Sequence, residues 1–135
     1  MKTNSSAFKY IYIFLCLILV FVSYSINRKR NQIKELKNLS LQNIEISNIA
    51  DGTYTGYANT TFLKVKLELI VQNGTLQNVK ILMNEGSVGQ NVASITEAMV
   101  KENKIIVSPI PDEEIASVVF MAAATNALSS QNQKW

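Results

Sequence analysis

Three adjacent carboxylates, Asp112, Glu113 and Glu114, form the densest cluster of chemically active side chains in the chain. They precede an alanine-rich stretch that is predicted to be a helix, so they fall at its N-terminus. Carboxylates at that end interact favourably with the helix dipole, which accounts for them without a ligand. Binding of a divalent cation is the alternative, but three consecutive residues rarely converge on one ion. We therefore expect helix capping here and no metal site.

Several kinds of chemistry are excluded by composition. The sequence has no histidine, so the usual general base and the commonest metal ligand are missing, which excludes hydrolase triads and zinc chemistry. Its single cysteine, Cys16, cannot form a disulfide or a redox pair within one chain. Lipoprotein acylation of Cys16 is disfavoured because the preceding Ile13, Phe14 and Leu15 are not small. We find no catalytic constellation and expect at most an electron-transfer role.

The net charge of +3 is unevenly distributed along the chain. Residues 1–47 hold seven basic and two acidic side chains, whereas residues 48–135 hold six lysines and eight acidic side chains. The later part has no arginine and lacks the basic footprint of a nucleic-acid-binding domain. The basic character therefore belongs to the segment around the hydrophobic run, and we expect no nucleic-acid partner.

Residues 10–27 carry no charge and consist mostly of Ile, Leu, Val, Phe and Tyr. About seventeen of them in a helix would span roughly 25 Å, the short end of the range that crosses a bilayer. Lys9 and Arg28 bracket the run and can reach the headgroups. A cleaved signal peptide is the alternative, because Ser23 and Ser25 supply small residues at cleavage spacing. We expect a retained anchor in the cell membrane, since the run is longer than most signal cores.

Five parts of the chain follow from this reading. We expect an N-terminal tail (1–9), a transmembrane anchor (10–27), a polar stalk (28–43), a folded domain (44–130) and a C-terminal tail (131–135). Ile33, Leu36 and Leu39 give the stalk a weak apolar stripe, so an amphipathic or partner helix is the alternative to a solvated connector. Basic residues on both sides of the anchor leave its orientation nearly undetermined by charge.

The folded domain is predicted to be α+β, with a small antiparallel sheet and two helices on one side. Residues 52–58 are β-prone, and residues 62–72 alternate apolar with polar residues as a half-buried strand does. Asn73 and Gly74 suit a type I′ turn into a return strand over 75–83, where the alternation slips near Asn78.

The second half of the domain is predicted to hold both helices. Residues 85–89 read as a flexible loop, and Asn91 or Ser94 is expected to cap a helix that ends near Asn103. Residues 105–107 are a short strand candidate. Pro109 and Pro111 forbid helix before a last helix over about 112–129. Its apolar stripe is expected to comprise Ile115, Val118, Val119 and Ala122.

This order of elements resembles the FMN-binding domain family, which opens with an isoleucine-rich lead into D-G-x-Y-x-G. Residues 44–56 read I-E-I-S-N-I-A-D-G-T-Y-T-G. The apolar strand, the Asn-Gly turn, the Glu-Gly loop and an alanine-rich helix ending in Asn126-Ala127-Leu128 match the same order. The resemblance spans residues 44–128. The family that it indicates includes the flavin-carrying small subunits of Rnf and sodium-pumping NADH:quinone reductase complexes. It implies an N-terminal anchor and a domain outside the cytoplasm.

The resemblance also implies where a flavin would lie. In those subunits a threonine of S-G-A-T-x-[ST]-S, at the start of the last helix, carries FMN through a phosphoester. Alignment back from Leu128 places residues 111–114 on S-G-A-T and Ser117 on the final serine. Glu114 then occupies the attachment position and has no hydroxyl to esterify, so no covalent flavin is expected. The remaining residues expected to contact FMN are Glu85, Gly86, Gly89 and Ser117.

Two functional hypotheses remain open. The first is a membrane-tethered flavoprotein that binds FMN without a covalent bond and passes electrons to a membrane-protein redox partner. The second is a flavin-free relative that keeps the fold as a binding or assembly module for a membrane partner. Tyr54 and Tyr57 could stack on a flavin, although aromatic strand residues usually serve packing.

Overall fold

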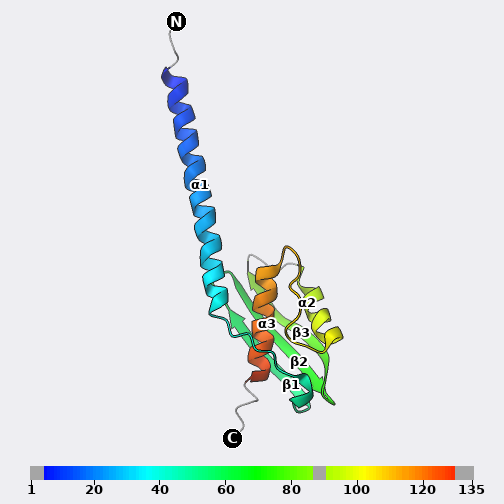
Figure 1. Ribbon diagram of the computed structural model, residues 1–135. Coiled ribbons are helices and arrows are strands. Elements are labelled where there is room, and N and C mark those ends of the chain that lie inside the picture. The colour runs from blue at the N-terminus through cyan, green and yellow to red at the C-terminus, as the bar shows by residue number, and fades with distance from the viewer. Residues whose placement is uncertain (1–4, 87–90, 130–135) are drawn as a thin grey trace.

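The computed structural model describes residues 5–86 and 91–129. In chain order it contains helix α1 (Ser5–Lys37), a 3₁₀ turn η1 (Ile46–Asn48), strands β1 (Gly52–Asn59), β2 (Leu63–Gln72) and β3 (Thr75–Gly86), and helices α2 (Ala93–Glu102) and α3 (Glu114–Ser129). Figure 1 shows α1 extending away from a domain that contains all the other elements. The predicted α+β class with a preceding apolar helix is confirmed.

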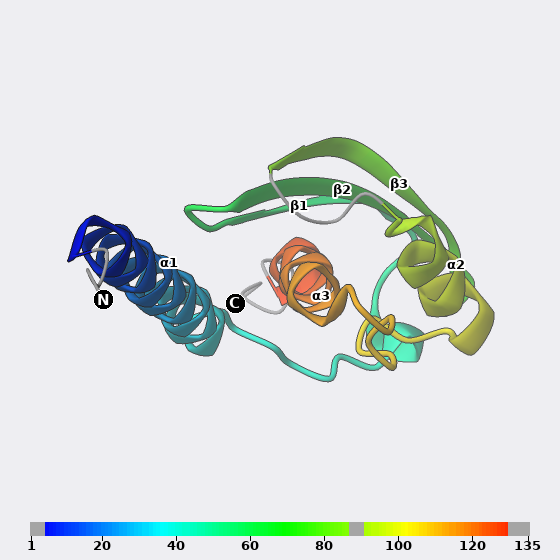
Figure 2. The ribbon, with the colours of Figure 1, turned by 90° about the horizontal axis from the view of Figure 1, so that it is seen from above.

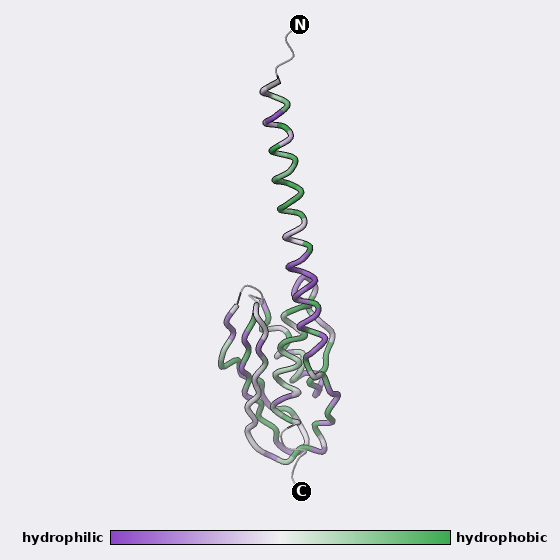
Figure 3. Tube along the Cα trace, turned by 90° about the vertical axis from the view of Figure 1, so that its left-hand side faces the viewer, coloured by the Kyte–Doolittle hydropathy of each residue, from purple (hydrophilic) through white to green (hydrophobic). Residues whose placement is uncertain are grey.

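Helix α1 is unbroken over 33 residues, which makes it about 50 Å long. Its apolar part is exposed along its whole length, and the helix is long and apolar enough to cross a membrane. Figure 3 shows this hydrophobic run followed by a hydrophilic stretch that leads into the domain. Residues 28–37 therefore continue the anchor helix instead of forming a separate connector.

The three strands form an antiparallel meander in the order β1-β2-β3. Asn73 and Gly74 have φ angles of 53° and 69°, as the predicted type I′ hairpin requires. Five apolar residues of β2 face the core and are no more than 1% exposed: Leu63, Val65, Leu67, Leu69 and Val71. The predicted slip of alternation is a register shift between Ile70 and Val71, where Gln77 of β3 is left without an opposite residue.

Both domain helices cover the same face of the sheet, as Figure 2 shows from above. α3 packs against β1 and β2, and α2 packs against β3. The apolar stripe predicted for α3 was too narrow: most of the helix is buried, whereas Ile115 and Val118 are only partly so. The helix is enclosed because the sheet lies on one side of it and the end of α1 contacts it on another.

Two local predictions in the second half are wrong. The capping residue of α2 is Val92, which makes no side-chain cap, and neither Asn91 nor Ser94 serves. Residues 105–107 form no strand, although Ile105 and Val107 are buried. This segment connects α2 to α3 on the helical side of the sheet and pairs with no described strand (Figure 2).

The end of the stalk is part of the domain. Leu36 and Leu39 are partly buried and pack against the core, as does Ile44 after them. Ile33, the first member of the weak apolar stripe, stays 50% exposed. Only Leu36 and Leu39 of the stripe therefore form a packing surface. The expectation of a solvated connector through residue 43 is wrong for these two residues.

Candidate functional site

The fold uses three of the four defining positions of the D-G-x-Y-x-G segment. The Asp51 carboxylate accepts a hydrogen bond from the backbone N–H of Asn73 at 2.7 Å, which ties the start of β1 to the hairpin turn. Tyr54 is 8% exposed, and its hydroxyl donates to the carbonyl of Ala50 at 2.5 Å. Gly56 lies directly beneath α3. Asp51, Tyr54 and Gly56 of the motif thus have structural roles in the fold itself.

Gly56 allows the closest helix–sheet contact in the domain. A Cβ added there would meet the carbonyl oxygen of Ala123 and would lie 2.5 Å from the backbone nitrogen of Ala127. Asn126, beside it on α3, donates from its side-chain amide to the carbonyl of Tyr57 at 2.8 Å. Tyr57 itself is 45% exposed, and the strand alternation places its ring on the sheet face opposite the helices. The two tyrosines considered for stacking therefore face opposite sides of the sheet.

Glu85 and Gly86 lie in β3, not in the flexible loop predicted for residues 85–89. Glu85 is opposite Lys64, and Gly86 is opposite Leu63. A Cβ at Gly86 would meet the carbonyl oxygen of Phe62 and would lie 2.8 Å from the Cα of Leu63. The group that approaches the backbone of Gly86 closely is therefore the protein's own chain.

A hollow does lie beside these two residues. It has a volume of about 330 Å³ and is lined by residues from the β1–β2 turn and from the facing ends of β2 and β3: Thr60, Thr61, Phe62, Leu63, Lys64, Glu85 and Gly86. Of the predicted flavin contacts, Glu85 and Gly86 therefore share one pocket. Gly89 lies outside the described residues. The residues of the β1–β2 turn that line this hollow could not be identified from the sequence, because their polar composition is their only sequence signal.

Ser117 lies elsewhere and is fully buried. Its hydroxyl donates to the carbonyl of Glu113 at 2.8 Å and accepts from the backbone N–H of Ile110 at 3.0 Å. These two bonds fasten the proline-rich segment onto the first turn of α3. Ser117 is not among the described residues that line the hollow at Gly86, so the structure does not bring the predicted flavin contacts into one site.

The acidic triplet lies at the head of α3, as predicted, although the helix begins at Glu114 and not at Asp112. Asp112 has a φ of 66°, in the left-handed region that favours glycine and that cannot continue a helix. In the gapless alignment Asp112 falls on the glycine of S-G-A-T. A glycine, the motif residue aligned with Asp112, would adopt this conformation without strain.

Two backbone amides that precede α3 are bonded within the chain. The N–H of Asp112 donates to the Glu114 carboxylate at 3.3 Å, and the N–H of Glu113 donates to the carbonyl of Ile110 at 3.0 Å. Two amides that could face an anion are thus engaged within the chain. The carboxylates also occupy the end of the helix where a phosphate would otherwise be attracted.

A polar contact joins the anchor helix to the domain. The Thr61 hydroxyl donates to Glu35 Oε1 at 2.6 Å, and the Thr61 backbone N–H donates to Glu35 Oε2 at 2.8 Å. These two bonds, the hydroxyl first and the amide second, hold the pKa of Glu35 below its ordinary value of 4.5. Glu35 lies beyond the apolar part of α1, so this carboxylate is in water-accessible surroundings. Nothing in the sequence links residues 35 and 61.

The pH dependence of this contact follows from the direction of the shift. Because the Glu35 pKa is lowered, the contact fully stabilises the packing of α1 against the domain above about pH 4.5. This stabilisation is lost as the pH falls through the lowered pKa of Glu35. We expect Thr61→Ala to raise the Glu35 pKa, because the hydroxyl bond is lost while the amide bond remains. Carbon-detected NMR titration of labelled glutamate carboxyls measures this. An identical Glu35 midpoint in both proteins would contradict the contact.

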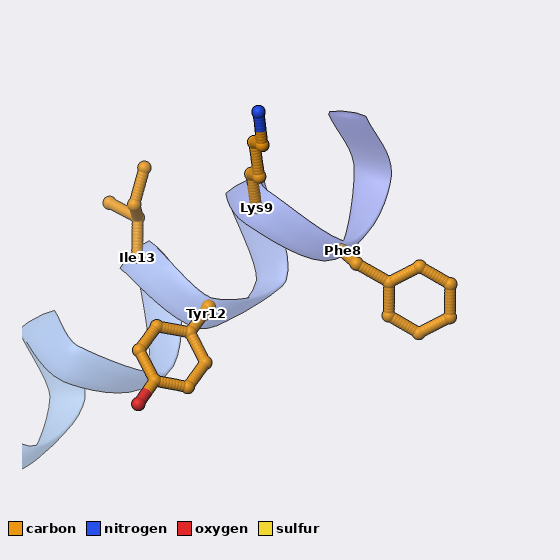
Figure 4. Close-up of a pocket in the computed structure, with 4 residues that line it drawn as sticks. All are labelled: Phe8, Lys9, Tyr12 and Ile13. Atoms are coloured by element: carbon orange, nitrogen blue, oxygen red, sulfur yellow. The ribbon is translucent and has the colours of Figure 1, made fainter. Parts of the chain in front are cut away.

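A second hollow, bounded by Phe8, Lys9, Tyr12 and Ile13, lies on α1 alone. Figure 4 shows that these side chains point outward from one helix, with no second element to close the space between them. In a membrane this surface would face lipid or a partner helix. The hollow exists only because no described residue outside α1 packs against this part of the helix. It is therefore not a candidate cofactor site.

Comparison with known proteins assigns neither a family nor a function to this chain. No family model matches the chain, and no curated protein or solved structure matches it.

Proposed function

We propose that this chain is a membrane-anchored relative of the FMN-binding domains that carries no flavin and serves as a binding or assembly module for a membrane partner. The proposal rests chiefly on Ser117, the residue aligned with the last serine of the flavin motif. Its hydroxyl is buried and bonded to Glu113 and Ile110. Breaking those bonds to reach a cofactor would leave the N–H of Ile110 without its acceptor.

The charge at the head of α3 supports the same function. A phosphate placed there would lie close to three carboxylates, and each close pair of like charges costs about 1 kcal/mol even in water. Glu114, at the aligned attachment position, cannot form a phosphoester. The domain has no arginine to offset this repulsion.

Non-covalent FMN binding with electron transfer is the second candidate function, and the hollow at Gly86 favours it. This pocket includes Glu85 and Gly86, two of the expected flavin contacts, and Lys64 could pair with a phosphate. In this case electrons would pass to a membrane-protein redox partner.

The proposal also includes the side of the membrane on which the domain lies. We place the domain outside the cytoplasm, as the resemblance implies, with α1 retained as the anchor. Protease added to intact cells should then remove the domain. Protection of the domain until the cells are lysed would reverse this placement.

Flavin content separates the two functions. We expect the full chain, purified from its native membrane in mild detergent, to be colourless and to release no FMN on acid precipitation. A second expected result is co-purification of a membrane protein in stoichiometric amount. A yellow protein with one FMN per chain would overturn the first function, and loss of that FMN in Lys64→Gln would place it in the hollow at Gly86.

A further inference from the structure

The part of α1 that follows its apolar run is strongly basic. Five side chains, here called the basic collar, are all exposed and lie within ten residues: Arg28, Lys29, Arg30, Lys34 and Lys37. None of them forms an ion pair with any residue in the described ranges 5–86 and 91–129. The one carboxylate among them, Glu35, is bonded to Thr61 instead of to a neighbouring lysine. The positive charge of the collar is therefore not neutralised within the chain.

The collar begins at the depth of the lipid headgroups if the hydrocarbon ends at Ile26. Because α1 is unbroken, each residue beyond Ile26 moves about 1.5 Å further from the hydrocarbon. The first three basic residues then lie within about 6 Å of that boundary, and Lys34 lies about 12 Å from it. Helical side chains lean toward the N-terminus, which here is the bilayer, so the lysine ammonium groups reach back toward the headgroups.

Helical geometry separates three of the five collar residues from the side of α1 that contacts the domain. With about 100° between successive residues, Arg30, Lys34 and Lys37 share one face. Glu35 and Leu36, which contact the domain, lie on roughly the opposite face. The domain therefore leaves the face with Arg30, Lys34 and Lys37 uncovered.

We propose that the basic collar is a binding site for the headgroups of anionic phospholipids. Basic residues next to a membrane span are attracted to such lipids over about one Debye length, roughly 8–10 Å. A second copy of the chain does not fit this face, because it would bring the same positive charges together. Since Glu35, Leu36 and Leu39 attach α1 to the domain, lipid bound at the collar also fixes the position of the domain above the bilayer.

This site is independent of flavin binding and requires only that α1 stays in the bilayer, which the intact mass of the purified protein checks. The full chain is reconstituted in phosphatidylcholine bilayers with spin-labelled phosphatidylglycerol or phosphatidylcholine, and electron paramagnetic resonance gives the share of each lipid held at the protein. We expect a preference for phosphatidylglycerol of about threefold or more that declines as salt is added. In R30Q/K34Q/K37Q the preference should fall to about half of that value or less.

A matched control removes the same charge from the domain surface. Lys66, Lys80 and Lys101 are exposed and lie outside the collar, so K66Q/K80Q/K101Q should keep the full lipid preference. No preference in the unaltered protein, or equal losses in the two triple variants, would overturn the proposal. So would an unchanged lipid preference in R30Q/K34Q/K37Q accompanied by loss of a co-purifying acidic membrane protein, which would assign this face to a protein partner.

Discussion

Replacing Gly56 by alanine should destabilise the domain by about 3 kcal/mol, because no space exists for the added methyl group. Its carbon would lie 2.5 Å from the backbone nitrogen of Ala127 and 2.7 Å from the Ala127 Cβ, and still closer to the Ala123 carbonyl oxygen. These are mainly backbone atoms of a helix that is itself enclosed, so neither a rotamer change nor a small shift can relieve the contact. The whole of α3 would have to move off β1.

Gly52→Ala is the matched control, since Gly52 begins the same strand. The nearest atoms to a Cβ there belong to the Tyr54 ring at 3.6 Å, an ordinary van der Waals distance. We expect a change of about 0.5 kcal/mol or less for this variant. Thermal unfolding of the full chain in detergent, followed by circular dichroism, should show a fall in Tm of more than about 10 °C for Gly56→Ala alone. Equal midpoints for the two variants would mean that α3 does not pack this closely on β1.

The hairpin could be predicted from sequence because its signals are local. The alternation from Leu63 to Leu69 fixes which side of β2 is buried, and Asn73-Gly74 fixes the turn and hence the register. By contrast, residues 105–107 show that a short apolar run does not distinguish a strand from a buried connection. The decisive fact, that this segment runs on the helical side of the domain, depends on tertiary packing.

The candidate site could be predicted only in part, for a related reason. A glycine such as Gly86 indicates that something approaches the backbone closely, but not whether that is a ligand or the chain itself. Ser117 was identified by alignment, yet its burial and its bond to Ile110 depend on how the proline-rich segment folds over α3. The contact between Glu35 and Thr61 joins residues 26 positions apart and leaves no periodic signal.

Restoring the missing motif should create affinity for FMN at the head of α3. The variant P111S/D112G/E113A/E114T removes three carboxylates and supplies two hydroxyls where the aligned motif has them. Each carboxylate removed relieves a repulsion of about 1 kcal/mol toward a phosphate, and the freed end of the helix attracts the anion. Together these changes should strengthen FMN binding by at least about tenfold, measured by quenching of flavin fluorescence during titration with the full chain.

The single substitution Asp112→Gly tests whether this gain comes from charge or from backbone shape. Asp112 already has the left-handed φ of 66° that glycine adopts without strain, so Asp112→Gly should leave the fold intact and raise its stability slightly. It removes only one of the three carboxylates and adds no hydroxyl, so its FMN affinity should rise by no more than about fivefold. A clearly larger gain in the fourfold variant would show that carboxylates have replaced a phosphate site whose backbone is still in place. No gain in either variant would mean that residues 111–114 do not correspond to S-G-A-T, and the assignment of Glu114 to the attachment position would then be wrong.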